Sequence, residues 1–520
     1  MEGNFKYFVD NDCLICEDSH LLIELVEKFD VDIVKFQQKH SYLPKIILNE
    51  RQPVRFLAGF IAACRANCSV FLCNPDWGKQ EWLQIFDLVK PDIICGIETK
   101  VVEALHSLDN FINITNPNPP CPMPNPPFGF TTPLNGGNLR TGVDSQSPYI
   151  MIPTGGSSGK IKFAVHTWDT LKASVLGFKE YFQVDKINSF CVLPLYHVSG
   201  LMQFMRCFIT GGKLIALPFK FLESEQVNDT KNNFHQLISS SEYFISLVPT
   251  QLERLLKKSD LTEWLSKFET VLLGGAPAWD ELLQKARFHH IRLAPTYGMT
   301  ETASQIATMK PEDFIQGKVG CGKILPHAKV KICDEKGEDL EVNQIGNINI
   351  QAESLALGYY PLSSKTQTCL QIDDLAFLDA QGYLNIVGRN SNKIITGGEK
   401  VHPTEVEAAI RATKIVADVC VIGLADKHWG EVVTAIYVVK TKEEGRGKKE
   451  ESWNCNGDLN KLLTKNERLI QTLLKEKLSN YKIPKIWIAV DSLPRNSQGK
   501  INRQKLYEIA IAEFSMQTTK

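Results

Sequence analysis

The sequence predicts an α/β fold (with α+β character): a large N-terminal region of α/β layers, a β-rich part within it, and a small C-terminal α/β region. Between residue 149 and about residue 310, short apolar strands alternate with helical stretches, which is typical of α/β layers. Residues 318–388 read as strands separated by Gly- and Asp-rich turns, and a compact run of helix, strand and strand follows. The 520 residues are too many for one hydrophobic core, so we expect two or more domains.

The first half of the chain carries most of the predicted α/β alternation. Residues 56–73 are apolar but interrupted by Arg65 and Asn67, which favours a buried helix and strand over a membrane span. Residues 115–148 are rich in Asn, Pro and Gly and predict a loop within the large domain, because proline blocks regular helix and central strand. The strands expected here are 70–74, 92–95, 149–152, 190–193, 213–217, 243–248 and 271–273.

The second half is predicted to contain a hairpin and a compact C-terminal unit. Asp379–Gly382 separates two apolar runs, which is a hairpin signal. Residues 441–451 are almost all charged or glycine and predict a solvated loop. We expect strands at 329–333, 347–350, 376–378, 383–387, 416–423 and 432–440, a helix at 404–412, and a final helix at about 459–478.

The charge balance excludes some classes of partner. The chain has 58 basic and 59 acidic residues and a formal net charge of −1, so no global basic field attracts nucleic acid or an anionic membrane. The N-terminus lacks the basic-then-apolar layout of a signal peptide, and we find no apolar run long enough to span a bilayer. We therefore expect no nucleic-acid partner, no transmembrane segment, and a cytoplasmic location (or an organelle stroma if the gene is plastid-encoded).

The 14 cysteines do not form a metal-binding pattern. Cys13 and Cys16 make the single C-x-x-C pair, and neither a second pair nor a histidine follows at zinc spacing. We expect these thiols to be reduced and mostly buried.

The loop from Pro153 to Lys162 is the strongest local signal of function. It places three glycines, three hydroxyl side chains and two lysines directly after an apolar strand. Such a loop can bring backbone N–H groups, hydroxyls and positive charge close to a phosphate. It is not a Walker loop, because Gly159-Lys160 is followed by Ile161 where Ser or Thr is required, and it lacks the Gly-x-Gly-x-x-Gly fingerprint. A plain Gly/Ser connection also remains open.

Four later segments accompany this loop. They are Leu273-Gly-Gly-Ala-Pro277, Tyr297-Gly-Met-Thr-Glu-Thr302, the stretch from Asp373-Asp374 through Arg389 to Lys400, and Pro494-Arg-Asn-Ser-Gln-Gly-Lys500. Taken singly, each has an ordinary interpretation: in the same order, a turn, a core tyrosine, an Asp374–Arg389 ion pair and a surface lysine. The occurrence of all four in this order is more informative than any one of them.

In this order the motifs resemble those of adenylate-forming acyl- and aryl-CoA ligases, the superfamily shared with luciferases and peptide-synthetase adenylation domains. The resemblance covers roughly residues 45–510. The family phosphate loop maps onto Thr154–Lys162 with Ile161 in place of proline, and Tyr297–Glu301 matches fully. Asp373 stands where the family has a glycine, and Ser391 stands at the family hinge position.

The resemblance implies a large domain over residues 1–389 and a small, mobile catalytic lid over residues 390–520. It implies an enzyme that joins a small-molecule carboxylic acid to coenzyme A, using ATP and Mg²⁺, through an acyl-adenylate. The implied phosphate-binding residues are Thr154, Gly155, Gly156, Ser157, Ser158, Gly159 and Lys162.

The resemblance also implies roles outside the loop. Thr300 contacts the α-phosphate, Glu301 holds Mg²⁺, and Lys500 bridges the attacking carboxylate and the α-phosphate. The other implied contacts are Gly275, Ala276, Pro277 and Tyr297 at the adenine, Asp374 and Arg389 at the ribose, and Gly397 and Gly398 along the pantetheine channel.

A finer resemblance, to the o-succinylbenzoate–CoA ligases of menaquinone and phylloquinone biosynthesis, rests on residues 153–168 and 193–200 with Arg206 beyond. It implies an acid with a second carboxylate, for which His197 and Arg206 are our candidate contacts. On one continuous helix these two residues would face opposite sides. We therefore expect a turn near Ser199-Gly200, with the Arg206 helix beginning after it.

Three alternatives stay open at this point. The chain could act on fatty or aromatic acids, could load a carrier protein as a stand-alone adenylation domain, or could be a non-catalytic ligand-binding descendant. Retention of Lys162, Glu301, Asp374, Arg389 and Lys500 together weighs against the last. The sequence also leaves a homo-oligomer open.

Overall fold

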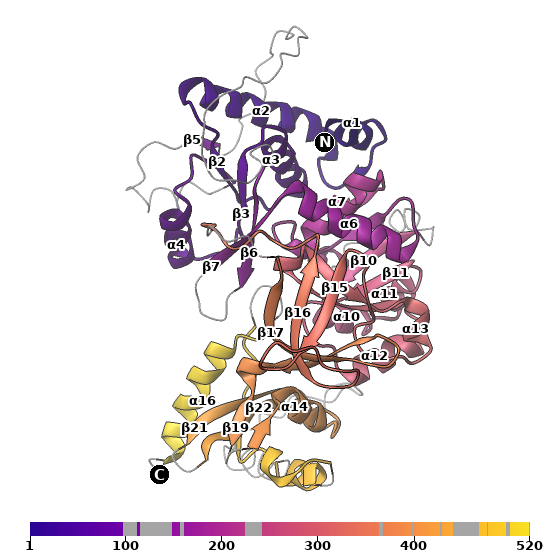
Figure 1. Ribbon diagram of the computed structural model, residues 1–520, viewed down its shortest axis with the longest axis vertical. Helices are drawn as coiled ribbons and strands as arrows, with labels where there is room; N and C mark the ends of the chain where they lie inside the picture. The colour runs from indigo at the N-terminus through magenta and orange to yellow at the C-terminus, as the bar shows by residue number, and fades with distance from the viewer. Residues whose placement is uncertain are drawn as a thin grey trace, which may run out of the picture.

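The computed structural model describes residues 1–96, 112–114, 148–155, 161–223, 242–362, 368–396, 399–426, 429–439, 467–475, 477–495 and 500–518. The described strands form four sheets. Figure 1 shows the sheet built from the last part of the chain at the opposite end of the molecule from helix α2, with the other sheets between. The predicted loops at 115–147 and 441–451 lie outside the described residues.

A six-stranded sheet brings the phosphate-loop candidate to its edge. Its order is β5-β4-β2-β3-β6-β7, parallel except for β7, which pairs antiparallel with β6. The largely buried strands β2, β3, β4 and β6 confirm the expected apolar runs, and the apolar stretch 56–73 is indeed a helix and a strand. The bounds are β2 Lys45–Leu48, β3 Ser69–Leu72, β4 Ile93–Cys95, β5 Ile112–Ile114, β6 Ile150–Gly155, β7 Ile161–His166, α2 Leu22–Lys39, α3 Pro53–Arg65 and α4 Lys79–Val89.

An eight-stranded sheet forms the second layer, in the order β1-β9-β8-β10-β11-β12-β13-β14. Helices α6 and α7 lie side by side next to it in Figure 1. Its strands confirm the predicted alternation. The bounds are β1 Leu14–Ile15, β8 Asn188–Cys191, β9 Leu214–Ala216, β10 Tyr243–Leu247, β11 Thr270–Leu273, β12 Leu293–Met299, β13 Ser304–Thr308, β14 Lys323–Ile324, α1 Glu2–Asp10, α6 Trp168–Phe182, α7 Val198–Thr210, α8 Phe219–Glu223, α10 Pro249–Leu255, α11 Ser259–Leu265, α12 Asp280–Phe288 and α13 Pro311–Ile315.

The β-rich segment is a four-stranded antiparallel sheet in chain order. The turn predicted at Asp379–Gly382 joins its last two strands, and their register sets Asp374 opposite Arg389. The hairpin prediction is confirmed. The bounds are β15 Ala328–Cys333, β16 Gly346–Ala352, β17 Leu370–Leu378 and β18 Leu384–Arg389.

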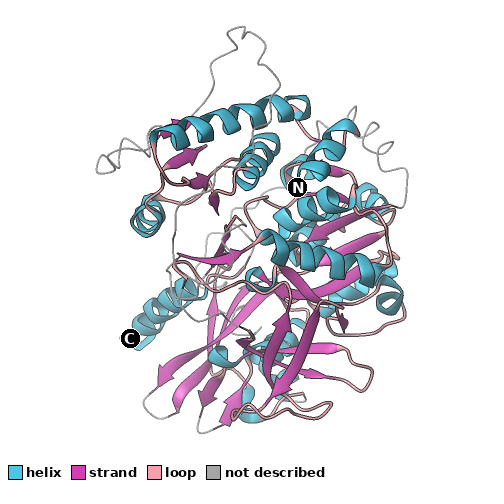
Figure 2. Cartoon of the chain, turned by 45° about the horizontal axis from the view of Figure 1, so that its top comes forward, coloured by secondary structure: helices cyan, strands magenta, loops and turns pink. Residues whose placement is uncertain are grey.

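The C-terminal sheet has its own apolar core, centred on residues of β21, β22 and α14. Residues 467–475 are helical, within the helix predicted at about 459–478. That helix is not the last, because α16 follows Lys500 and packs on β21. Figure 2 shows this helix ending at the C-terminus. The bounds are β19 Ile394–Thr396, β20 Glu399–Val401, α14 Pro403–Arg411, β21 Val416–Asp426, β22 Gly430–Val439, β23 Ile486–Ala489 and α16 Arg503–Thr518.

The described cysteines match the expectation of free, mostly buried thiols. All twelve are free, and nine of them are buried. Burial raises the pKa of thiols such as Cys191 and Cys207 to about 12, so they are inert rather than nucleophilic. Among the described residues, no helix is both long and apolar enough to cross a bilayer.

His166 links the edge of the six-stranded sheet to the turn after β12. Its side chain is fully buried, and its Nε2–H donates to the carbonyl oxygen of Thr300 at 2.8 Å. Its Nδ1 lies 3.0 Å from the Thr170 hydroxyl, from which it accepts. Burial lowers the pKa of His166 from 6.5 to about 4, so the imidazole is neutral in the folded protein.

We predict acid-dependent destabilisation through His166. Because its pKa is lower in the folded state, the unfolded chain binds an extra proton between pH 6.5 and about 4, and stability falls as the pH is lowered through this range. Each pH unit contributes at most ~1.4 kcal/mol. The His166→Gln variant should have a lower free energy of unfolding than the wild type at neutral pH. Between pH 6.5 and 4.5, however, its free energy of unfolding should fall by ~2 kcal/mol less than that of the wild type. Urea unfolding at several pH values measures this, and parallel curves for the two proteins would contradict it.

Candidate functional site

The predicted phosphate loop is a hairpin connection between β6 and β7. Thr154 at the end of β6 pairs with Lys162 at the start of β7, and Gly155 pairs with Ile161. The Lys162 side chain is exposed. Both flanks of the loop therefore lie side by side. The remaining predicted loop residues, Gly156, Ser157, Ser158 and Gly159, and likewise Gly397 and Gly398, lie outside the described residues.

The segment Tyr297–Glu301 forms the end of β12 and a tight 3₁₀ turn, Thr300–Thr302. At Gly298 a Cβ would lie 2.1 Å from the Ser304 carbonyl oxygen, so only glycine allows the start of β13 to pack this close to β12. Ala303 has a φ of 50°, in the left-handed region, and its carbonyl accepts a 2.7 Å hydrogen bond from Ser174. The chain thus reverses sharply just after Glu301.

Asp374 is held by two of the predicted site residues. The Tyr297 hydroxyl donates to Oδ2 at 2.6 Å, and Arg389 Nε donates to Oδ1 at 3.0 Å. Burial, and then the Asp374 charge, raise the pKa of Tyr297, which keeps the phenol protonated as a donor. The ordinary interpretation of Asp374 and Arg389 as a pair is correct. A carboxylate has about four acceptor positions, so two remain for a ligand's hydroxyls.

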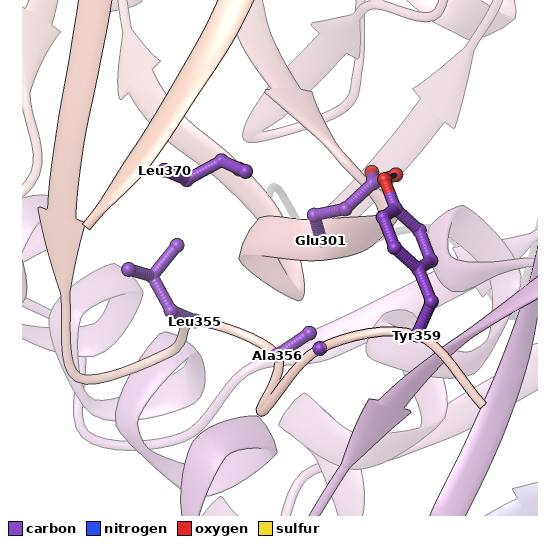
Figure 3. A pocket seen from close by; sticks show the side chains of 6 residues that line it. Glu301, Leu355, Ala356, Tyr359 and Leu370 are labelled. Carbon is purple, nitrogen blue, oxygen red and sulfur yellow. Dashed lines mark hydrogen bonds between the residues drawn. The ribbon is translucent and has the colours of Figure 1, made fainter. Parts of the chain in front are cut away.

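Glu301 lies at a small pocket between the turn and the segment that follows β16. The Tyr359 hydroxyl donates to Glu301 Oε1 at 2.6 Å, and Figure 3 shows the two groups meeting at the pocket edge. Sequence reasoning missed Tyr359, because Gly358-Tyr359-Tyr360 gives no motif signal of its own. The pocket is lined by Glu301, Leu355, Ala356, Gly358, Tyr359 and Leu370.

Lys500 comes from the C-terminal region yet lies among the charges of the large-domain site. Lys500 is exposed to solvent, yet the protein around it removes enough water to lower the pKa of its ammonium. Nearby Arg389 also lowers this pKa, while Glu301 and Asp374 raise it. The structure thus brings four of the predicted residues into one electrostatic neighbourhood.

Ion pairs anchor both sides of the Lys500 segment to the C-terminal core. Arg495 pairs with Asp418 on β21 ahead of the lysine. Behind it, Arg503 lies 3.8 Å from the buried carboxylate of Glu407 on α14. An antiparallel bridge joins Arg495 to Ile501, the residue after Lys500.

The predicted turn near Ser199-Gly200 is wrong. Helix α7 is continuous from Val198 to Thr210, so no turn interrupts it at Ser199-Gly200. The turn lies before the helix, where His197 N–H donates to the Pro194 carbonyl at 3.1 Å. His197 is therefore the residue before the helix. Burial, and then the charge of Lys500, lower its pKa to about 4.

Arg206 lies nine residues further along α7 and is almost fully buried, with 2% exposure. Its guanidinium donates to Gln305 Oε1 at 2.7 Å and lies 4.2 Å from the centroid of the Phe178 ring. Among the described residues, no carboxylate forms an ion pair with it, and its Nε has no hydrogen-bond partner. A buried charge of this kind needs a counter-charge or strong dipoles.

The turn Gly275-Ala276-Pro277 follows β11 directly, as predicted. Gly275 has a φ of 81°, which favours glycine. At the preceding Gly274 a Cβ would lie 2.5 Å from the Thr296 hydroxyl, so the turn lies close against β12. Tyr297 is the next residue of that strand.

The described residues fit a magnesium ion better than a metal held by protein alone. They contain no group of three or more His, Cys, Asp or Glu side chains able to hold a metal. Glu301 supplies one carboxylate. Mg²⁺ typically keeps several waters and binds one or two carboxylates together with substrate phosphates, so a single glutamate is a suitable protein ligand.

Comparison with known proteins identifies the family. The model of the AMP-binding enzyme family matches residues 46–360, and that of the AMP-binding enzyme C-terminal domain matches residues 405–500. A 2-succinylbenzoate–CoA ligase of Listeria monocytogenes is 34% identical over 380 residues, covering 71% of this chain and 72% of the relative. One from Oceanobacillus iheyensis is 30% identical over 379 residues, covering 71% of each.

Solved structures share the fold. The o-succinylbenzoate CoA synthetase of Bacillus subtilis in complex with its acyl-adenylate intermediate has a TM-score of 0.74 at 23% identity and covers 97% of both chains. ATP-bound MatB from Rhodopseudomonas palustris has a TM-score of 0.71 at 21% identity, covering 93% of this chain and 92% of its own. The chain belongs to the AMP-binding enzyme family, and its fold is that of the adenylate-forming enzymes.

Proposed function

We propose that the protein is an ATP-dependent acid–CoA ligase that converts o-succinylbenzoate, ATP and CoA to o-succinylbenzoyl-CoA, AMP and pyrophosphate. The observation that carries the proposal is the position of Lys500 beside Glu301, Asp374 and Arg389. The names of the relatives at 30–34% identity support the choice of acid. We place the reaction in the cytoplasm, where thiols stay reduced, and the free cysteines support this.

In the first half-reaction, a carboxylate oxygen of the acid attacks the α-phosphorus of ATP. A new P–O bond forms, the bond to the β-phosphate oxygen breaks, and pyrophosphate leaves with its electron pair. The protein contributes mainly position and charge in such a reaction. We assign the β- and γ-phosphates to the Thr154–Lys162 loop, the α-phosphate to Thr300 and Lys500, and the ribose to Asp374 and Arg389.

Glu301 is the residue that we expect to hold Mg²⁺, which would neutralise phosphate charge when bound. The adenine would lie between Tyr297 and the turn Gly275-Ala276-Pro277. Gly274 supports this assignment, because the absence of a side chain there lets the turn after β11 lie close against Thr296 of β12, next to Tyr297.

In the second half-reaction, the CoA thiol loses its proton and attacks the acyl carbon. The C–S bond forms, the acyl C–O bond to the phosphate breaks, AMP leaves with that electron pair, and the thiol proton passes to solvent. We propose that residues 390–520 form a domain that turns about Ser391 between the two halves, removing Lys500 and bringing Gly397-Gly398 to the thiol channel. Ser391 lies in a 3₁₀ turn, Asn390–Asn392, between β18 and β19.

For the acid, we propose that His197 and Arg206 serve the second carboxylate and the keto group. His197 lies near Lys500, where the reacting carboxylate is expected. Arg206 lies deeper along α7 and carries a buried charge with no described carboxylate partner, which a substrate carboxylate would neutralise. His197 stands just before α7 and Arg206 lies within it, bonded to Ser304 and Gln305, so Arg206 would act from the Ser304–Gln305 side.

The direct test of the function is pyrophosphate release across a panel of acids, with and without CoA. We expect release with o-succinylbenzoate and little release with fatty or simple aromatic acids. Equal rates across the panel would contradict the proposed substrate. No acid-dependent release at all would contradict an enzymatic role.

Lys500→Ala should separate the two half-reactions. Adenylate formation should fall by ~10²–10³, because Lys500 stabilises charge that develops in the transition state. Thioester formation from supplied acyl-adenylate should remain near the wild-type rate. Single-turnover assays of each half measure this, with Lys505→Ala, an exposed lysine on α16, as control. Equal loss in both halves would remove Lys500 from the proposed role.

Arg206→Gln tests the acid pocket. Loss of a charge-assisted hydrogen bond should raise KM for o-succinylbenzoate ~10–100-fold and leave KM for ATP unchanged. Arg206→Lys keeps the charge, so its KM for o-succinylbenzoate should lie between those of the wild type and Arg206→Gln. This intermediate value distinguishes a binding defect from a folding defect. An unchanged KM for the acid in both variants would show that Arg206 is a structural residue.

A further inference from the structure

The segment that follows β16 is laid along β7 like an extra strand. Both backbone polar groups of Val165 bond this segment: its N–H donates to the Gly358 carbonyl at 2.9 Å, and its carbonyl accepts from Leu357 N–H at 2.8 Å. Tyr360 N–H donates to the Phe163 carbonyl at 2.9 Å. The strand that leaves the phosphate loop and the segment 357–360 are therefore one rigid unit.

Strand-like backbone sends successive side chains to opposite faces, and the two tyrosines follow this rule. Tyr360 points into the core, where its ring meets Phe71 edge-on at 4.9 Å. Tyr359 points the other way and is 39% exposed. Figure 3 shows its hydroxyl directed at the carboxylate of Glu301. The half-buried Tyr360 thus anchors the backbone that presents the exposed Tyr359.

Tyr359 connects two residues that are expected at the phosphates. Its hydroxyl donates to Glu301 Oε1 at 2.6 Å, and Lys162 Nζ lies 5.3 Å from the centroid of its ring. The segment also binds the Glu301 backbone, since Ala356 N–H donates to the Glu301 carbonyl at 2.8 Å. Both ends of Glu301, backbone and carboxylate, are thereby tied to residues 356–359.

We infer that Tyr359 is a positioning residue for the metal–phosphate end of the site: its hydroxyl holds the Glu301 carboxylate in the orientation that receives Mg²⁺. The inference rests on the proposed function. The hydrogen bond uses Oε1, and among the described residues Oε2 has no hydrogen-bond partner. A flexible glutamate loses side-chain freedom when it binds a metal, and a carboxylate already fixed by a neighbour loses less.

The lone position of Glu301 makes this orientation important. The described residues offer no second carboxylate cluster that could take over the metal. The pocket wall beside Glu301 is apolar, formed by Leu355 and Leu370, so no other polar side chain of the wall can orient it. Tyr359 is then the group on which the carboxylate depends.

Tyr359→Phe removes the hydroxyl but keeps the ring beneath Lys162. ATP binding to the full-length protein is measured by calorimetry twice, once with excess Mg²⁺ and once with EDTA. We expect binding in EDTA to stay within about twofold of the wild type, and the gain in affinity from Mg²⁺ to shrink by ~5–20-fold, the equivalent of one charge-assisted hydrogen bond. The Mg²⁺ concentration for half-maximal pyrophosphate release should rise in parallel.

Tyr360→Phe is the matched control, because it removes a hydroxyl from the adjacent tyrosine and keeps the core ring. It should behave as the wild type in both titrations. In a Glu301→Gln background, Tyr359→Phe should have no further effect on the Mg²⁺ gain. A wild-type Mg²⁺ gain in Tyr359→Phe, or an equal loss in EDTA and Mg²⁺, would overturn the inference. If the wild type itself shows neither a Mg²⁺ gain nor acid-dependent pyrophosphate release, the proposed function fails first.

Discussion

The sharp turn after β12 is the constraint on which the rest of the site depends. Three backbone carbonyls of this turn accept hydrogen bonds from three distant parts of the chain: Thr300 from His166, Glu301 from Ala356, and Ala303 from Ser174. Buried carbonyls must be paired, so β7, α6 and the segment after β16 cannot move independently of the turn. These hydrogen bonds fix the backbone of the turn, and the backbone sets the positions of the Thr300 and Glu301 side chains.

The charges around the turn are balanced in a way that suits an anionic ligand. Arg389 and Lys500 face Asp374 and Glu301, and Asp374 is the less exposed partner of the Arg389 pair, at 17% against 58%. Each carboxylate is partly engaged, Asp374 by Tyr297 and Arg389 and Glu301 by Tyr359, while the ammonium of Lys500 lies within electrostatic range of both. A phosphate that enters would find cations already in place, and little rearrangement of the protein would be needed.

Local patterns predicted much of the fold, the family resemblance supplied most of the candidate residues, and tertiary pairing explains what both missed. The strands and the hairpin at Asp379–Gly382 depend on alternation and turn residues, which a sequence displays. Strand β23 pairs parallel with β22 across a long insertion, and α16 has no distinct amphipathic pattern, so neither was predicted. Tyr359 was missed for a related reason, because its role arises from pairing with β7, almost 200 positions away in the sequence.

The anchoring of the Lys500 segment constrains how the two half-reactions can alternate. Arg495 is tied to Asp418 and Arg503 to Glu407, so both sides of the segment are bound to the core of the C-terminal region. Glu407 is buried and also accepts a hydrogen bond from the backbone of β21, and a charge held in this way is costly to release. A movement of Arg495 and Arg503 away from this core would break these pairs. We therefore propose that the C-terminal region carries Lys500 away from the adenylate as a unit before the thiol arrives, and that the short 3₁₀ turn Asn390–Asn392, which lies between β18 and β19, is the connection that bends.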